Sequence, residues 1–458
     1  MTTFPVKNGG GLSRRKFLIT SAIASVGSLA ASSLAWAANI FKATSGETVY
    51  FRGWQFMPDV VVSNVNRYNS TNDGKVDYQT ITGDYPALME KALIAKDNLD
   101  VIYGNPPTLV RFVEAGWVAP ADDLPNADEA KADLYDNVRA IWTYKGKLLG
   151  LSYFLATRGV IAVNRIRQEE LGIADDQLPK TWDEFYAQLD ALTAKGHKDL
   201  YLPHWFNEYY GLSWEFYAEV INRGGSIVDP ATRAPVVSVD GPAGKVLAAW
   251  KKAWKAGQIP EEVLSYTEAN LVDGFASGRY LYSGQACYNL AYFNNKDKSK
   301  IPGKVGFIPY RGQSWGLMDS ALYVKTARKR SPALEADVNK FVSWYGYKDN
   351  DGVVFVGSRW MKEAMLFSGY KSVMESSETA ATMKGLLARE SDVQELLTVY
   401  KNTGAPNDVW QTVWAEEFNA WLKERLPNFL LKDETVESVI ADITTQVNGL
   451  NKKYKVKG

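Results

Sequence analysis

Residues that form disulfides and bind metals are scarce in this 458-residue chain, which has one cysteine, Cys287, and two histidines. A lone cysteine excludes an internal disulfide. The same scarcity leaves little material for a metal site or for thiol chemistry. We therefore predict no cofactor and no metal site, and we expect Cys287 to be a buried structural thiol.

An excess of charge of either sign is also absent, because Lys and Arg number 52 and Asp and Glu number 52. Such a balance argues against a nucleic-acid-binding protein and against a protein held on a membrane by charge. Hydrophobic residues make up 46% of the chain and aromatic residues 13%, which excludes disorder, collagen and coiled coil. The length indicates two or three domains.

The first 37 residues have the features of an export signal. SRRKFL at 13–18 places two arginines before an apolar, Ala/Ser-rich stretch at 19–34, and AWA at 35–37 offers small residues for a signal peptidase. The stretch is too short and too weakly apolar for a comfortable transmembrane helix. This pattern resembles a twin-arginine (Tat) signal peptide, which implies the Tat translocase as a partner during export. No cysteine follows the cleavage site, so we expect a free protein in the periplasm.

Beyond the signal, short apolar runs alternate with amphipathic stretches, a pattern typical of α/β proteins. The pattern predicts strands at 48–53, 75–81 and 99–103 and helices at 58–68 and 85–95. GNPP at 104–107 ends the third strand and opens another helix. Strand–helix units in succession imply a parallel sheet, with ligands at the carboxyl ends of its strands.

Farther along the chain, PKTWDE at 179–184 predicts the start of a helix. Thr181 would cap the N–H of Glu184, while Glu184 would reach back to Thr181. Gly196 is a suitable residue to end this helix. The stretch from Glu363 to the end is rich in predicted helix.

Several motifs occur in an order that is familiar from one protein family. They are LDVIY at 99–103, FVEAGWVAP at 112–120, GKLLGLSY at 146–153, PKTWDEF at 179–185, FASGR at 275–279 and VGFIP at 305–309. Together they resemble the family 1 extracellular solute-binding proteins, the maltose-binding type of ABC-importer receptor. The chain departs from the family pattern at Val163, where Tyr is usual, and at Ala286, where sugar binders often have Trp. These departures leave the ligand open.

The resemblance implies a binding protein rather than an enzyme, with an α/β, two-lobed periplasmic-binding-protein fold and a ligand cleft between the lobes. Lobe closure around the solute and an ABC permease as partner are part of that implication. By analogy, the chain crosses between lobes near Tyr153, Asp319-Ser320 and Gly357-Ser358. The predicted N-terminal lobe comprises 39–153 and 320–357, and the predicted C-terminal lobe comprises 154–319 and 358–458.

A neutral polyhydroxylated ligand needs aromatic platforms for its C–H faces and planar polar side chains for its hydroxyls. At the ends of the N-terminal strands and at the first crossing, the candidates for ligand binding are Trp54, Gln55, Tyr85, Asn105, Tyr153, Thr157 and Arg158. Asp84 is equally a helix N-cap. Arg158 would either clamp a solute carboxylate or pair with a carboxylate of its own lobe.

The C-terminal lobe has a dense aromatic and polar loop, PHWFNEYY at 203–210. In this lobe and at the later crossings, the candidates are Trp205, Asn207, Trp214, Gln285, Trp315, Asp319 and Trp360. Trp315 and Asp319 would form a platform and a hydroxyl acceptor, or alternatively a hinge-packing ring and a turn cap. Trp410 and Trp414, four residues apart, are expected on the core face of a late helix.

We predict a monomeric periplasmic receptor that delivers a carbohydrate or related polyol to an ABC importer. One alternative is a receptor for an anionic solute, such as a sugar acid or glycerol phosphate, which Arg158, Arg311 and Arg359 would serve. Another is a metal receptor, because Tyr209-Tyr210 resembles the tandem tyrosines of ferric-ion receptors. A third is a Tat-exported carbohydrate-active enzyme, although HExxH, CxxC, GxSxG, P-loop and GxGxxG motifs are missing from the sequence.

Overall fold

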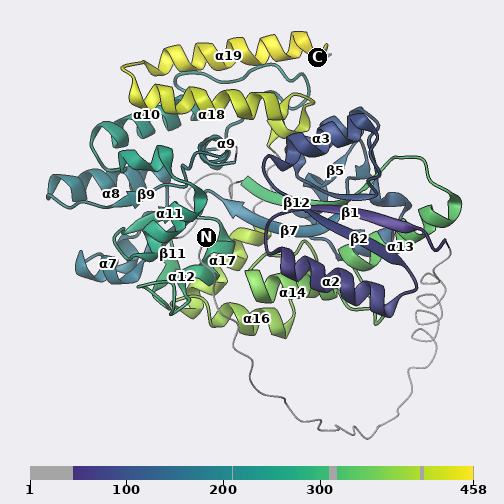
Figure 1. Ribbon diagram of the computed structural model, residues 1–458. Helices are drawn as coiled ribbons and strands as arrows, with labels where there is room; N and C mark the ends of the chain where they lie inside the picture. Colours follow the sequence, from purple (N-terminus) through teal and green to yellow (C-terminus); the bar gives the residue numbers. More distant parts are fainter. Residues whose placement is uncertain (1–44, 209, 309–316, 403–406, 457–458) are drawn as a thin grey trace, which may run out of the picture. The chain divides into compact units, whose positions relative to one another are not determined.

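Two β-sheets organise the computed structural model, which describes residues 45–208, 210–308, 317–402 and 407–456. The first sheet has the strand order β2-β1-β3-β12-β4, with β7 paired to β12, and the second has the order β11-β8-β10-β9 (Figure 1). A short pair, β5-β6, stands apart from both. The strands are β1 Thr48–Trp54, β2 Lys75–Ile81, β3 Val101–Gly104, β4 Val118–Ala119, β5 Thr143–Tyr144, β6 Lys147–Leu148, β7 Leu151–Arg158, β8 Ile161–Asn164, β9 Tyr201–Leu202, β10 Tyr282–Gly284, β11 Val305–Phe307 and β12 Leu317–Thr326.

Helices surround the two sheets and account for most of the remaining chain. In the first two-thirds of the chain they are α2 Pro58–Thr71, α3 Tyr85–Ala95, α4 Pro106–Glu114, α5 Ala127–Asp133, α6 Asp136–Ile141, α7 Arg165–Glu170, α8 Trp182–Ala194, α9 Leu212–Asn222, α10 Pro242–Lys255, α11 Glu268–Ala276 and α12 Leu290–Phe293. After β12 they are α13 Pro332–Gly346, α14 Phe355–Ala364, α15 Lys371–Met374, α16 Ser377–Lys384, α17 Glu390–Asn402, α18 Ala415–Leu431 and α19 Val436–Lys453. Short 3-10 turns are η1 Ala121–Asp123, η2 Asp175–Gln177, η3 Glu261–Ser265, η4 Cys287–Asn289 and η5 Asp408–Gln411.

The first sheet begins with the three parallel strands that the sequence predicts. β1 pairs with β2 on one side and with β3 on the other, both in parallel. β2 and α3 have their predicted bounds, whereas β1 and α2 run slightly longer and β3 is shifted toward Gly104. Alternate residues of β1 are buried, and Phe51 packs against Tyr103 and Phe341 at ring-centroid distances of 5.4 and 5.6 Å. The carboxyl ends of β1 and β3 therefore meet at one edge of the sheet.

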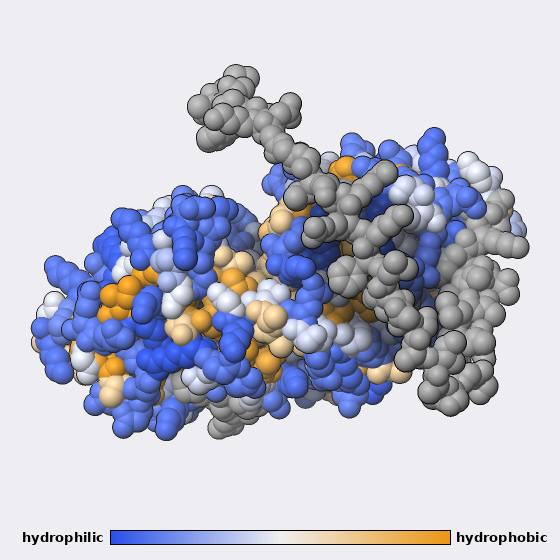
Figure 2. All heavy atoms as spheres, turned by 90° about the horizontal axis from the view of Figure 1, so that it is seen from below, coloured by the Kyte–Doolittle hydropathy of each residue, from blue (hydrophilic) through white to orange (hydrophobic). Residues whose placement is uncertain are grey.

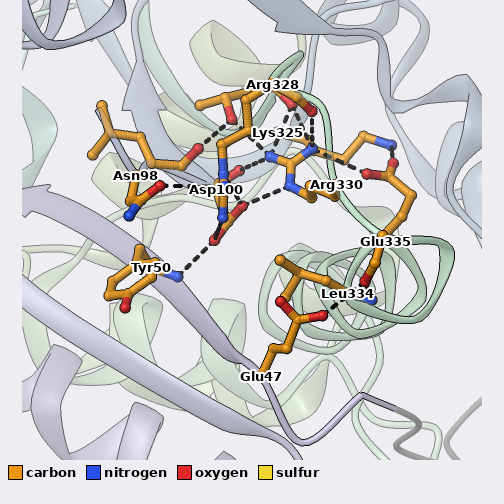
Figure 3. Close-up of polar contacts among 12 residues, drawn as sticks. Glu47, Tyr50, Asn98, Asp100, Lys325, Arg328, Arg330, Leu334 and Glu335 are labelled. Carbon is orange, nitrogen blue, oxygen red and sulfur yellow. Dashed lines mark hydrogen bonds and ion pairs between the residues drawn. The ribbon is translucent and has the colours of Figure 1, made fainter. Parts of the chain in front are cut away.

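A buried carboxylate, Asp100, anchors the opposite end of β3 (Figure 3). It accepts the backbone N–H of Tyr50 at 2.9 Å and pairs with Arg328 at 2.7 Å and Arg330 at 2.6 Å. Arg330 also pairs with Glu335 on α13 at 3.0 Å. Burial alone would raise the pKa of Asp100, but the two guanidinium groups and the N–H of Tyr50 outweigh burial and lower it. This network joins β1, β3, the chain after β12 and α13.

β7 and β12 connect the two sheets. They pair antiparallel from Leu317 to Tyr323 of β12, with an irregularity after Ala321, and the residues of β12 are buried along its whole length. β7 continues through Gly159, at φ +75, into β8 of the second sheet. The predicted crossings at Tyr153 and Asp319-Ser320 lie within these two strands. The third, Gly357-Ser358, lies inside α14.

α14 contacts the predicted N-terminal lobe, because Arg359 donates to Asn64 of α2 at 2.7 Å. At the other side of the molecule, α18 packs against α9 and α10, and α19 packs against α10 (Figure 1). The exact lobe boundaries stay a prediction.

Three local expectations can be compared with the structure directly. Thr181 caps the N–H of Glu184 at 3.2 Å, as predicted, but the carboxylate of Glu184 accepts the N–H of Lys180 instead of Thr181. Cys287 is buried, as predicted. Trp410 lies in η5 and Trp414 is the N-cap of α18, so they do not share a helix, although both are buried core residues.

Within the described ranges, no helix combines the length and the apolar character needed to cross a membrane. Figure 2 shows a face that is mostly hydrophilic, with hydrophobic residues in small groups. Large exposed apolar side chains such as Val62, Ile94 and Leu431 come from different helices. Single exposed residues of this kind are ordinary on protein surfaces.

Candidate ligand cleft

A cleft of about 610 Å³ opens where the carboxyl ends of β1 and β3 face residues that surround the second sheet. Aromatic side chains dominate its wall: Trp54, Phe56, Tyr85, Tyr153, Phe154, Tyr210, Trp214 and Tyr288. The amides in the wall are Gln55, Asn105 and Asn207, and the charged side chains are Asp84, Glu208, Glu268, Asp319 and Lys423. The mixture of ring faces and a few polar groups is typical of a small-molecule site.

A separate hollow of about 450 Å³ lies between the ends of α8 and α10. Its lining includes one aromatic residue, Tyr280, beside the ion pair of Arg279 and Asp199. The larger cleft is the better candidate, because it lies at strand ends and combines rings with polar groups.

Tyr85 holds the N-terminal wall of the cleft together. Its hydroxyl donates to the carbonyl oxygen of Arg52 and accepts the N–H of Tyr103, both at 2.9 Å, and so joins α3 to β1 and β3. Trp54 packs on this framework, with its ring 5.5 Å from Tyr85 and 5.6 Å from Tyr153. Burial raises the pKa of Tyr85 well above that of a free phenol. Tyr85 is therefore a wall residue whose hydroxyl is already engaged.

Two neighbouring polar residues make local bonds. Asp84 caps α3 by accepting the N–H of Ala87 at 3.2 Å, which confirms its role as an N-cap. The side-chain oxygen of Asn105 accepts the hydroxyl of Thr108 at 2.8 Å at the start of α4. Each of them still lines the cleft.

Five charged or titratable side chains form a group at the cleft, which we call the buried charge cluster: Glu268 and Asp319 line the cleft, and Arg158, His204 and Glu215 lie behind them. Arg158 is fully buried and donates to Asp319 from Nε at 3.1 Å and from Nη2 at 2.9 Å. Its Nη1 lies 3.4 Å from Glu215 and also contacts Nδ1 of His204. On the other side of the imidazole, Nε2 of His204 lies 3.5 Å from Glu268.

The two carboxylates of the cluster that line the cleft have opposite pKa shifts. Burial would raise the pKa of Glu268, but contacts with His204, Arg158 and Tyr288 outweigh burial and lower it to about 2. For Asp319, burial is the stronger effect and raises the pKa despite the ion pair with Arg158. Glu268 is therefore ionised at any physiological pH.

The structure brings eight of the candidates from the sequence to the cleft wall: Trp54, Gln55, Tyr85, Asn105, Tyr153, Asn207, Trp214 and Asp319. Their contact with a solute stays a prediction. Trp315 lies outside the described residues, as do Arg311 and Tyr209.

The other five candidates do not line the cleft. Arg158 pairs with carboxylates of the chain itself, which was one of its two predicted roles, and Thr157 beside it is fully buried. Trp205 lies in the core, 4.4 Å from Trp250. Gln285 is buried and donates to Ser283 at 2.8 Å. Trp360 donates to the hydroxyl of Tyr323 at 3.0 Å, behind the wall.

Sequence reasoning named Tyr210 only for the metal alternative, and it did not select several other residues that line the cleft: Phe56, Phe154, Glu208, Glu268, Tyr288 and Lys423. Phe56 and Phe154 adjoin selected residues, so a wider window around strand ends would have found them. Glu268 is the first residue of α11 and Lys423 lies in the middle of α18. Local sequence carries no signal for these two, because only the tertiary fold brings them to the cleft.

Among the described residues, no three His, Cys, Asp or Glu side chains are arranged to hold a metal ion.

Residues 57–350 match the family model of bacterial extracellular solute-binding proteins, which is more than half of the chain. The chain belongs to this family. The family predicted from the sequence motifs is thereby confirmed. Membership of this family places the solute-binding protein in the periplasm or outside the cell. Among curated proteins, no sequence matches it.

Solved structures share the fold of this solute-binding protein over nearly the whole chain. Maltose-bound MalE3 of T. maritima has a TM-score of 0.69 and 18% identity, covering 88% of this chain and 99% of that one. A solute-binding protein of Agrobacterium radiobacter K84 in complex with ribitol has a TM-score of 0.71 and 15% identity, covering 89% and 100%. The sugar-binding protein MalE of Xanthomonas citri has a TM-score of 0.70 and 16% identity, covering 89% of this chain and 98% of that one. The predicted α/β, two-lobed periplasmic-binding-protein fold is confirmed.

Proposed function

We propose that this solute-binding protein captures a carbohydrate or polyol in the cleft and delivers it to the permease of an ABC importer. The observation that carries the proposal is the cleft wall, in which eight aromatic side chains stand beside three amides. Sugar rings and polyols present C–H faces that pack on aromatic rings and hydroxyls that pair with amides and carboxylates. Solved relatives with maltose or ribitol bound support the same class of solute.

Trp54 is the residue that best fits a stacking platform. It is partly exposed, it is the last residue of β1, and Tyr85 and Tyr153 support its ring from the protein side. Gln55 and Asn207 are exposed polar side chains on opposite walls, within the same cleft. A solute held between these walls would draw them together around β7 and β12, which is closure by hinge motion with no bond made or broken.

Among the arginines named for an anionic solute, the two in the described part of the chain are already engaged, which argues against such a solute. Arg158 is paired with Asp319 and Glu215, and Arg359 is engaged by Glu363 and Asn64. A guanidinium that already satisfies buried or neighbouring carboxylates is not free to clamp a second one.

The test is a thermal-shift and calorimetry screen of residues 38–458 against monosaccharides, oligosaccharides, polyols, sugar acids and ferric ion. A solute at about one hundred times its Kd adds about 2.7 kcal/mol of stability, which raises the melting temperature measurably. Trp54→Ala should weaken binding of the responding sugar by about 2 kcal/mol, or about thirtyfold. Trp421→Ala, which removes a partly buried ring stacked on Phe418 outside the cleft, is the matched control. A response to acids or iron alone would refute the proposal.

We also propose that the Tat translocase exports the protein to the periplasm, where it acts as a monomer. The paired Arg14 and Arg15 ahead of an apolar stretch support this route. Replacing both with Lys should leave the protein in the cytoplasmic fraction, and size-exclusion chromatography of the exported protein should give the mass of one chain. Unchanged export of the Lys variant would contradict the Tat route.

A further inference from the structure

Carboxylates outnumber cations on the wall of the cleft. Asp84, Glu208, Glu268 and Asp319 line it, and Lys423 is the single Lys or Arg on its described wall. A cleft lined by charges of one sign concentrates their field and attracts ions of the opposite sign. The electrostatic potential in this cleft therefore favours a cation and disfavours an anion.

The buried charge cluster does not balance this charge. Glu268 and Asp319 belong both to the wall and to the cluster, and the other members of the cluster are the guanidinium of Arg158, the imidazole of His204 and a third carboxylate, Glu215. Three carboxylates therefore share one guanidinium and one imidazole. Charges that are removed from water are costly unless they are paired. A cationic group arriving in the cleft would supply the missing partner.

Glu268 is the carboxylate of the cluster that is best placed to receive such a group. Its side chain is 19% exposed and lines the cleft, whereas that of Asp319 is 8% exposed and held by Arg158. The hydroxyls of Tyr288 and Tyr210 donate to its two oxygens at 2.6 and 3.3 Å. These bonds orient the carboxylate without neutralising it.

The rings beside Glu268 suit a cation as well. Tyr210, Trp214, Tyr288 and Phe154 line the same part of the cleft, and the faces of aromatic rings attract positive charge. The guanidinium of Arg158 already lies 5.5 Å from the ring centroid of Trp214 and 5.9 Å from that of Tyr210. A carboxylate within a set of rings is an arrangement that binds ammonium groups more favourably than hydroxyls alone.

We propose that the solute carries a protonated amine, as an amino sugar or an aminated oligosaccharide does, and that its ammonium group binds beside Glu268. This inference rests on the proposed carbohydrate function and names the class of carbohydrate. A neutral sugar can also donate hydroxyls to Glu268, but it leaves the excess negative charge of the cleft and the buried charge cluster uncompensated.

The experiment compares carbohydrates that share one skeleton and differ in charge. Calorimetry with the purified mature protein would use glucose, glucosamine and glucuronate, and then cellobiose, N,N′-diacetylchitobiose and its fully deacetylated form. We expect the amine-bearing member of a set to bind at least about tenfold more tightly than its neutral counterpart at neutral pH. The advantage should shrink when the salt concentration rises from about 0.05 M to about 0.5 M, because salt screens the charge pair but not the ring contacts.

Variants then assign the effect to one side chain. Glu268→Gln keeps the shape of the side chain and removes its charge, so it should abolish the advantage of the amine over its neutral counterpart. Glu417→Gln is the matched control, because Glu417 pairs with Lys453 and Tyr454 away from the cleft. It should leave both affinities unchanged.

The outcomes separate this inference from the function on which it rests. Equal or tighter binding of the neutral or acidic members overturns the amine inference and leaves the carbohydrate receptor intact. Binding of none of these sugars, with a response to non-carbohydrate solutes, overturns both. The comparison within each set is made on the natural protein, so it decides the matter even if Glu268→Gln fails to fold.

Discussion

Replacing Arg158 with Met should destabilise the protein far more than the loss of an ordinary ion pair does. The side chain of Arg158 is fully buried and lies 2.9 Å from Asp319 and 3.4 Å from Glu215. The substitution leaves these carboxylates buried without their guanidinium partner. Breaking a buried pair in this way costs about 3–5 kcal/mol, because solvent does not compensate the remaining charges. A surface pair, Lys453 with Glu417, has side chains 58% and 36% exposed, and Lys453→Met should cost at most about 1 kcal/mol.

Urea unfolding followed by tryptophan fluorescence measures the loss of unfolding free energy in both variants. The pH dependence of that loss tests whether buried carboxylates cause it. Burial raises the pKa of Asp319 and Arg158 partly offsets this, so the pKa should rise further in the Arg158→Met variant. A carboxyl group whose folded-state pKa is raised stabilises the fold at low pH, and this stability is lost as the pH rises through that pKa. The variant should therefore approach the natural protein in stability as the pH falls from about 7 toward about 4. Equal costs for the two substitutions, or a gap that widens toward acid, would refute this reasoning.

Three further predictions concern other buried groups. Glu268, with its pKa lowered to about 2 from 4.5, contributes stability that is present above pH 4.5 and lost as the pH falls toward 2. In urea unfolding, Glu268→Gln should reduce this loss of unfolding free energy at acid pH by up to about 3 kcal/mol. An unchanged loss in the variant would contradict the lowered pKa of Glu268. Asp100→Asn should lower the unfolding free energy by about 3–5 kcal/mol, since it breaks the pairs with Arg328 and Arg330, while the stabilisation by a bound solute stays as in the natural protein. Cys287 should not react with Ellman's reagent until urea unfolds the chain, because burial hides the thiol and raises its pKa to about 12; rapid reaction of the native protein would show that it is accessible.

The N-terminal part of the cleft was predictable because its determinants are local. Apolar periodicity and the Gly and Pro residues at 104–107 mark where β3 ends, and parallel strands bring such ends together. Trp54, Tyr85 and Asn105 were therefore assigned to one sheet edge without knowledge of any long-range contact, and the structure places them there.

Elsewhere, local sequence was insufficient because it does not say which side of a loop faces the cleft. Trp205 and Asn207 come from the same short loop, yet Trp205 is buried against Trp250 and Asn207 is exposed in the cleft. The sequence did not show whether Arg158 binds a solute or pairs with a carboxylate of the chain, because only the fold brings Asp319 and Glu215 within its reach. Glu268 and Lys423 belong to helices whose sequences carry no local signal of a ligand site.

The anchoring network of Asp100 has a practical consequence for anyone who wishes to redesign the receptor. Asp100 precedes β3 and Asn105 follows it, so the two lie about 17 Å apart along one extended strand. Substitutions that are separated by more than about 10 Å and share no partner have additive effects on free energy. Substitutions at one end of the strand can therefore change thermal stability, and substitutions at the other end can change solute preference, with independent effects.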